Sequence, residues 1–142
     1  MMLSMYSLTG CKDNIVEPSE GTYTLQYQRP GLLDSITGDC SVVITRVAYL
    51  DSIDFRGASK MKMEFDAHTD ADISFIKFFY LNADTAVNII NLEGSEMINR
   101  TSIEADVPDS KQYCYLRLGL RSSVCTGDIF HIKLRDLKIY TK

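Results

Sequence analysis

Residues 60–81 read KMKMEFDAHTDADISFIKFFYL, and they predict two strands joined by an acidic turn. Over residues 60–66, apolar side chains alternate with charged ones, which is the two-residue period of a strand with one buried face. The turn follows at residues 67–72. Residues 73–81 are apolar on both parities, which indicates a strand inside a sheet with protein on both of its faces. We expect this hairpin to form the centre of the fold.

Strand patterns on both sides of this hairpin predict an all-β domain, because no segment sustains the 3.6-residue apolar period of a helix. Residues 41–50 are apolar on both parities and predict a second central strand. The tripeptide Arg29-Pro30-Gly31 predicts a turn that ends the first strand. The expected strands are residues 22–28, 41–50, 60–66, 73–81, 86–92, 97–107, 113–121 and 129–140.

The last expected strand changes phase part-way along its length. Phe130, Ile132 and Leu134 share one parity, whereas Leu137 and Ile139 share the other. One slipped residue near Arg135-Asp136 turns both sets inward, so the sequence predicts a β-bulge there. Together the strands predict an antiparallel two-sheet β-sandwich of about eight strands. The sandwich is expected to be a jelly roll or, alternatively, an immunoglobulin- or fibronectin-like fold.

Length and composition limit the class of protein. The 142 residues suffice for one domain with its own core, and 45% hydrophobic and 24% charged residues are ordinary globular values. The net charge of -4, together with the lack of a basic stripe, argues against nucleic acid as a partner. No apolar run approaches the roughly 20 residues that a membrane-spanning helix requires.

Near the N-terminus, Leu8-Thr9-Gly10-Cys11 resembles the lipobox of bacterial lipoproteins, in which the cysteine is lipidated after a signal peptide is cleaved. The resemblance implies lipidation of Cys11, a signal-peptide remnant over residues 1–10, a tether over residues 11–21 and a folded domain over residues 22–142. It also implies a place in the bacterial cell envelope, at the outer membrane or cell surface, with lipid as the only membrane anchor. The alternative is a mildly apolar N-terminus that carries no signal.

Three further cysteines lie in the expected domain, in a compartment where disulfides form. Cys40 and Cys125 each lie in a loop beside a Gly-Asp pair, which makes Cys40–Cys125 the preferred disulfide and Cys114–Cys125 its competitor. Cys114 shares its parity with three leucines, which indicates a buried core thiol. No Cys-x-x-Cys spacing occurs, so neither structural zinc nor dithiol redox chemistry is expected.

Acidic residues around the central turn form the first candidate site. Asp66, His68, Asp70 and Asp72 recur at every second position, so an extended backbone would place them on one side. Carboxylate oxygens suit a hard cation such as calcium, and the histidine would also tolerate a transition metal. We favour a solvated hairpin turn and keep a metal site as the alternative.

The sequence lacks the motifs of common enzyme classes. It has two histidines, and it contains no Gly-x-Ser-x-Gly, no His-Glu-x-x-His and no glycine-rich phosphate loop. Nothing among the 19 acidic residues selects a pair for glycoside hydrolysis. We therefore expect a protein that is not an enzyme.

The second candidate site lies in residues 113–121, which show the cleanest alternation in the chain. On their polar parity, Tyr113, Tyr115, Arg117 and Arg121 would project from one sheet face. Tyrosine rings stack on the apolar faces of sugars, and guanidinium groups donate hydrogen bonds to hydroxyls. The simpler interpretation is that the tyrosines cover a second core face, and the functional interpretation is a carbohydrate-binding surface.

Two segments resemble the galactose-binding-like jelly rolls, which include many carbohydrate-binding modules. The final strand, IFHIKLRDLKIY over residues 129–140, has their apolar-x-Asp-apolar-x-apolar pattern. KMKMEFDA over residues 60–67 is similar to their core strand before a hairpin. The resemblance implies a jelly roll that holds a structural calcium ion as its cofactor, with Asp136 in the position of a calcium ligand.

These features together predict a lipid-anchored, non-catalytic β-sandwich on the bacterial envelope that binds carbohydrate or another extracellular ligand. The alternative is a structural or protein-interaction lipoprotein, with an envelope protein as its partner and no small-molecule site.

Overall fold

The computed structural model describes residues 21–94 and 102–142. These residues form eight strands and no helix, so no helix among them is long and apolar enough to cross a membrane. The candidate lipidation site Cys11 and the expected signal-peptide remnant lie outside the described residues. The strands are β1 (Thr24–Gly38), β2 (Ile44–Asp54), β3 (Lys60–Thr69), β4 (Ile73–Asn82), β5 (Thr85–Glu93), β6 (Ser102–Asp106), β7 (Lys111–Arg121) and β8 (Phe130–Thr141).

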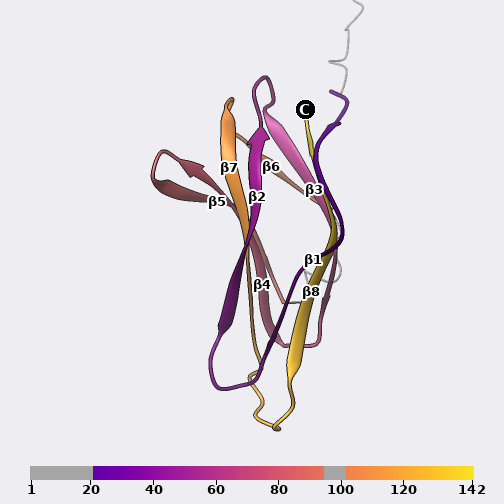
Figure 1. Cartoon of the computed structure of the whole chain (residues 1–142), viewed down its shortest axis with the longest axis vertical. Helices are drawn as coiled ribbons and strands as arrows, with labels where there is room; N and C mark the ends of the chain where they lie inside the picture. The colour runs from indigo at the N-terminus through magenta and orange to yellow at the C-terminus, as the bar shows by residue number, and fades with distance from the viewer. Residues whose placement is uncertain (1–20, 95–101) are drawn as a thin grey trace, which may run out of the picture.

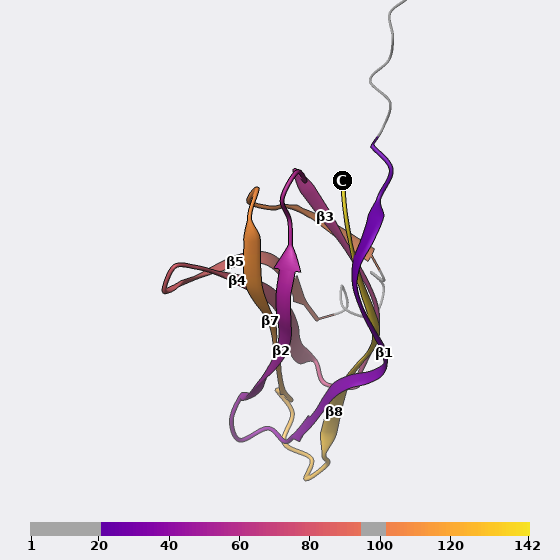
Figure 2. The ribbon, with the colours of Figure 1, turned by 45° about the horizontal axis from the view of Figure 1, so that its top comes forward.

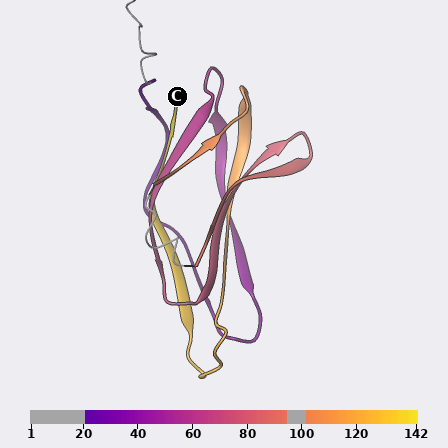
Figure 3. The ribbon, with the colours of Figure 1, turned by 180° about the vertical axis from the view of Figure 1, so that it is seen from behind.

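The strands form two antiparallel four-stranded sheets packed face to face (Figure 1). Sheet A has the order β1-β8-β3-β6, and sheet B has the order β2-β7-β4-β5. Figure 3 shows the molecule from behind, with the β4–β5 hairpin projecting away from the body of the sandwich. The expectation of a two-sheet antiparallel sandwich of about eight strands is confirmed.

The strand pairs are nested around the middle of the chain. β4 pairs with β5, β3 with β6, β2 with β7 and β1 with β8, so the chain is one long hairpin folded across two layers. Lateral pairing of β3 with β8 and of β4 with β7 then closes each sheet. This is the strand arrangement of a jelly roll. An immunoglobulin-like sandwich would place β1 and β2 side by side in one sheet, whereas here they lie in different sheets.

The core lies between the inward faces of the two sheets. Alternate residues of the central strands are fully buried, among them Met61 and Met63 of β3 and Leu116 and Leu118 of β7. Burying such a side chain contributes about 1.5–3 kcal/mol. The Cys114 thiol is part of this core, as predicted, and burial raises its pKa to about 12. The two strands expected over residues 60–81 form, but the expectation that they pair as a hairpin is wrong, because β3 lies in sheet A and β4 in sheet B. The turn between them crosses from one sheet to the other.

Two strands differ from their expected surroundings. Residues 41–50 were expected to form a central strand, but β2 lies at the edge of sheet B. Its outward side chains Val47 and Tyr49 are exposed. β4 is internal, as predicted, but its outward Phe75 and Phe79 are only half-buried. In both strands, therefore, the outward apolar side chains are partly exposed to solvent and do not pack under another layer of the described protein.

The first strand is also longer than expected, because Arg29-Pro30-Gly31 forms an irregularity within β1 rather than a turn that ends it. Pro30 is tolerated there because β1 is an edge strand. Opposite it, β8 carries the predicted bulge at Asp136, whose φ is 52°. The Gly31 amide, at φ 75°, donates a 2.7 Å hydrogen bond to Oδ1 of Asp136. The bulge turns both Leu134 and Leu137 into the core.

Replacing Asp136 with alanine should lower the free energy of unfolding by about 1–2 kcal/mol, because alanine is strained at positive φ and cannot accept the Gly31 hydrogen bond. Asparagine tolerates the left-handed region and keeps an amide oxygen at the same place, so D136N should stay within about 0.5 kcal/mol of wild type. Denaturant unfolding of the three proteins measures the difference. Equal stability of D136A and wild type would contradict this account of the bulge.

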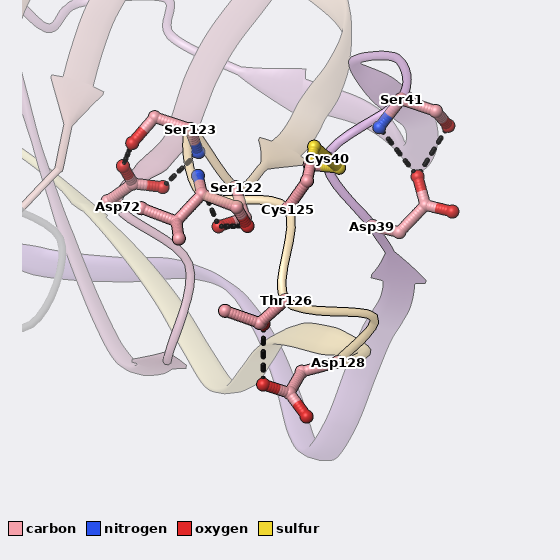
Figure 4. Close-up of a disulfide and its surroundings, with 10 residues drawn as sticks. Asp39, Cys40, Ser41, Asp72, Ser122, Ser123, Cys125, Thr126 and Asp128 are labelled. Carbon is pink, nitrogen blue, oxygen red and sulfur yellow. Dashed lines mark hydrogen bonds between the residues drawn. A yellow bond between two sulfur atoms is a disulfide. The ribbon is translucent and has the colours of Figure 1, made fainter.

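A disulfide joins Cys40 to Cys125, with 5.2 Å between their Cα atoms, and this is the pairing that the sequence favoured (Figure 4). Cys40 lies in the β1–β2 connection and Cys125 in the β7–β8 connection, so the bond ties together two crossings between the sheets. The Ser123 amide donates a 2.8 Å hydrogen bond to Asp72, which holds the second connection to the β3–β4 turn. Hydrogen bonds from the Ser123 hydroxyl and amide lower the pKa of the Asp72 carboxyl.

The C40S/C125S double variant should lose about 2–5 kcal/mol of unfolding free energy, because the bond closes a loop across a separation of 85 residues. Dithiothreitol should lower the thermal midpoint of wild type to about that of the double variant. It should leave the double variant unchanged, since the buried Cys114 provides no disulfide to reduce. A wild-type midpoint that does not respond to dithiothreitol would contradict a stabilising role for the bond.

Candidate functional site: the outer face of sheet B

The four predicted ligand-binding residues project from the outward face of β7, the side away from the core. They alternate with buried residues along the strand, as the sequence predicted. Tyr113 is 41% exposed, Arg117 is exposed, and Tyr115 and Arg121 are half-buried. The tyrosines therefore do not cover a second core face. The exposure of Tyr113 shows that this part of the face is open to solvent.

Neighbouring strands add two aromatic residues to this face. Tyr49 of β2 and Phe79 of β4 are the direct cross-strand partners of Tyr115. The Phe79 and Tyr115 rings are stacked, with centroids 5.0 Å apart and an angle of 6° between their planes. The Tyr49 ring lies 6.1 Å from Tyr115 and 6.1 Å from Tyr113. These separations fall in the range of favourable aromatic pairs.

We call Tyr49, Phe79, Tyr113 and Tyr115 the aromatic face. Tyr49 is its most accessible ring, at 61% exposed. Sequence reasoning missed Tyr49 and Phe79, because the period along one strand does not show which strands lie beside it. The signal that was available is that both residues belong to runs that are apolar on both parities.

A row of cationic and apolar side chains lies next to the aromatic face. Two residues along each strand from the aromatic face, Arg117 of β7 lies between its cross-strand partners, Val47 of β2 and Lys77 of β4. Val47 is 40% exposed. The Lys77 ammonium lies 5.1 Å from the centre of the Phe75 ring, which is a cation–π distance.

Phe75 in turn lies against the backbone of Gly119. A Cβ atom at Gly119 would fall 2.3 Å from the Phe75 ring, so glycine is required for this close approach. A shallow depression of about 570 Å³ lies beside this contact, and Phe75, Lys77 and Glu93 are among the residues that line it. The outer face of sheet B therefore offers exposed rings, two adjacent cations and a recess along one side.

The predicted metal ligands are not gathered into one site. In residues 21–94 and 102–142, no three His, Cys, Asp or Glu side chains come together in a way that would hold a metal ion. Asp66 and Asp136 line the same depression of about 320 Å³ on sheet A, but Asp136 already accepts the hydrogen bond from Gly31. Asp70 and Asp72 lie in the β3–β4 turn, away from that depression.

Each turn carboxylate has a structural partner instead. Asp70 accepts a hydrogen bond from the backbone amide of His131, and its Oδ2 lies 3.2 Å from His131 Nδ1. Asp72 accepts hydrogen bonds from the amide and hydroxyl of Ser123. Burial raises the pKa of Asp70, but the hydrogen bonds from His131 outweigh burial and bring it below the usual value. Asp70 and Asp72 thus lie in one turn, as the alternation predicted, but their carboxylate oxygens face different partners and do not converge on one point.

No protein-family model matches the sequence, and no curated protein is similar to it. Among solved structures, the chain is similar to part of a chain in the structure of infectious bursal disease virus Gt strain, with a TM-score of 0.45 and 10% sequence identity. The similarity covers 96% of this chain and 36% of the viral one, so the chain spans about a third of that protein's length. A similarity of this size concerns the path of the backbone and says nothing about a ligand.

Proposed function

We propose that this protein is a lipid-anchored, non-catalytic binding module of the bacterial envelope, and that its ligand is a carbohydrate held on the aromatic face. The observation that supports this is the contiguous row of Tyr49, Tyr115 and Phe79, with Tyr113 beside it, on an open sheet surface. Exposed rings that stack against one another present flat apolar area next to phenol hydroxyls. Such a surface suits the C–H faces and hydroxyls of a pyranose.

The sheet surface is also well suited to hold the rings in place. Tyr49, Tyr115 and Phe79 sit on three adjacent strands, and backbone pairing fixes the spacing of those strands. The core beneath is closely packed, with Leu116 fully buried directly after Tyr115. The rings are therefore preorganised, which reduces the entropy lost when a ligand binds.

The place where the described chain begins fits an anchored module. β1 begins beside the C-terminus, with Thr24 paired to Thr141, and both ends of the described chain lie at one end of the sandwich (Figure 2). The disulfide loops lie at the opposite end (Figure 1). In this proposal the lipid on Cys11 keeps the end of the sandwich that carries the start of β1 toward the membrane. The aromatic face then runs along the side of the domain and stays accessible.

A second candidate function is docking of an envelope protein, and the edge of sheet B favours it. β2 is an edge strand, and Val42, Val43 and Val47 in or before it are exposed. An exposed apolar edge is a common place for another chain to add. In this case the aromatic face would contribute apolar contact area and would bind no sugar.

Carbohydrate binding should depend on the aromatic rings. On a glycan array, replacement of Tyr115 or Tyr49 with alanine in the full chain should weaken the retained glycans about tenfold, because each variant removes stacking area. Tyr140→Ala is the matched control, since Tyr140 contacts Lys62 on the outer face of sheet A. If Y115A and Y49A both keep wild-type retention, or if wild type retains no glycan, the carbohydrate proposal is wrong and the docking alternative remains.

Lipidation should depend on Cys11. Cells that express the full chain and are fed a clickable fatty acid should show a labelled band for wild type and none for C11A. The labelled protein should fractionate with membranes, because acyl chains bury apolar surface in the bilayer. C114A serves as the control, since that thiol is buried in the core. Equal labelling of wild type and C11A, or labelling of neither, would rule out the anchor.

A further inference from the structure

The cationic row beside the aromatic face contains an unfavourable pair. Lys77 of β4 and Arg117 of β7 are direct cross-strand partners, so two positive side chains leave the same face at neighbouring positions. Like charges at such positions destabilise a sheet. Among the described residues, neither cation forms an ion pair, whereas Arg46, Arg56, Lys60 and Lys62 each do.

Ion pairing differs between the lysines of β3 on sheet A and the cation pair on sheet B. On sheet A, two of the outward lysines have carboxylate partners: Lys60 lies 3.1 Å from Asp106, and Lys62 lies 2.8 Å from Glu64. On sheet B, Glu93 is the carboxylate that shares a depression with Lys77, and it accepts a 3.1 Å hydrogen bond from Asn91. Lys77 and Arg117 thus form a local pair of cations on a chain whose net charge is -4.

We propose that the ligand of the aromatic face is an anionic glycan, whose carboxylate or sulfate groups bind Arg117 and Lys77. This inference rests on the proposed carbohydrate-binding function. Tyr115 and Arg117 are two residues apart on one strand face, a distance of about 7 Å. A sugar ring stacked on Tyr115 therefore presents its charged substituent within reach of the guanidinium, which binds carboxylate and sulfate through paired N–H donors.

An anionic ligand also explains the like-charge pair. The carboxylate or sulfate would lie between two cations and turn their mutual repulsion into attraction for the ligand. Single-stranded nucleic acid combines stacking with negative charge as well. It carries a charge at every nucleotide and needs a basic groove that follows its backbone, whereas this face has the Lys77–Arg117 pair and the half-buried Arg121 on an acidic protein. The observations therefore favour a glycan.

The test uses the full chain on an array of uronate-containing, sulfated and neutral glycans, together with a 20-nucleotide oligothymidine. Each retained acidic glycan is then compared with its own carboxyl-reduced or desulfated form. Acidic glycans should dominate, and the neutralised form should bind about tenfold more weakly. K77Q and R117Q should each weaken binding of the acidic form by about tenfold and should leave binding of the neutralised form unchanged. Lys133→Gln, an exposed cation of β8 on sheet A, should have no effect.

The outcomes separate this inference from the function on which it rests. If neutral glycans dominate, or if K77Q and R117Q bind acidic glycans like wild type, the anionic inference is wrong while carbohydrate binding stands. If no glycan is retained, both are wrong. If the oligothymidine is retained as tightly as the best glycan and is lost in R117Q, the face binds nucleic acid and the glycan inference is overturned. Raising sodium chloride from 50 to 500 mM should weaken the acidic glycans selectively.

Discussion

The register of β8 is the constraint on which sheet A depends, and it is set by the bulge at Asp136. β8 lies between β1 and β3, and without the bulge the apolar side chains on one side of Asp136 would turn toward solvent. The bulge absorbs the extra residue, and the Asp136 carboxylate holds the amide of Gly31 on the neighbouring strand. Two irregularities that face each other, one in β1 and one in β8, thus keep a long strand pair facing the core throughout.

This arrangement leaves the outer faces of the sandwich to other uses. A jelly roll has two layers, and each sheet buries one of its faces against the other. Among residues 21–94 and 102–142, the outward side chains of sheet B therefore have one another as their main neighbours. The rings of Tyr49, Tyr115 and Phe79 pack against one another. The Phe75 ring packs against the backbone of Gly119, where a side chain would clash. The aromatic face is stable as a surface because its residues lie side by side on paired strands.

Much of the fold was predictable from periodicity, because alternation along one strand is a local property. The β3 and β7 patterns, the β8 bulge and the core position of Cys114 all follow from which side of a strand each residue occupies. Contacts between strands were not predictable in the same way. β2 was expected at the centre of a sheet because an outward apolar row looks the same whether protein or solvent lies against it. Tyr113 and Tyr115 were identified from sequence, whereas Tyr49 and Phe79 required the pairing of the sheet.

The aromatic rings alone do not decide between a structural and a functional role, because cross-strand aromatic pairs stabilise sheets by about 0.2–1 kcal/mol each. The neighbouring cationic row is informative because its like charges lower the stability of the sheet, whereas the aromatic pairs raise it. Lys77 and Arg117 repel each other as direct cross-strand partners, and a polar neutral residue at either position would stabilise the fold better. A surface that served stability alone would combine favourable rings with favourable charges. Here favourable ring contacts lie two residues along the strands from a repulsive cation pair. This combination supports our proposal of a ligand that supplies both an apolar face and a negative charge.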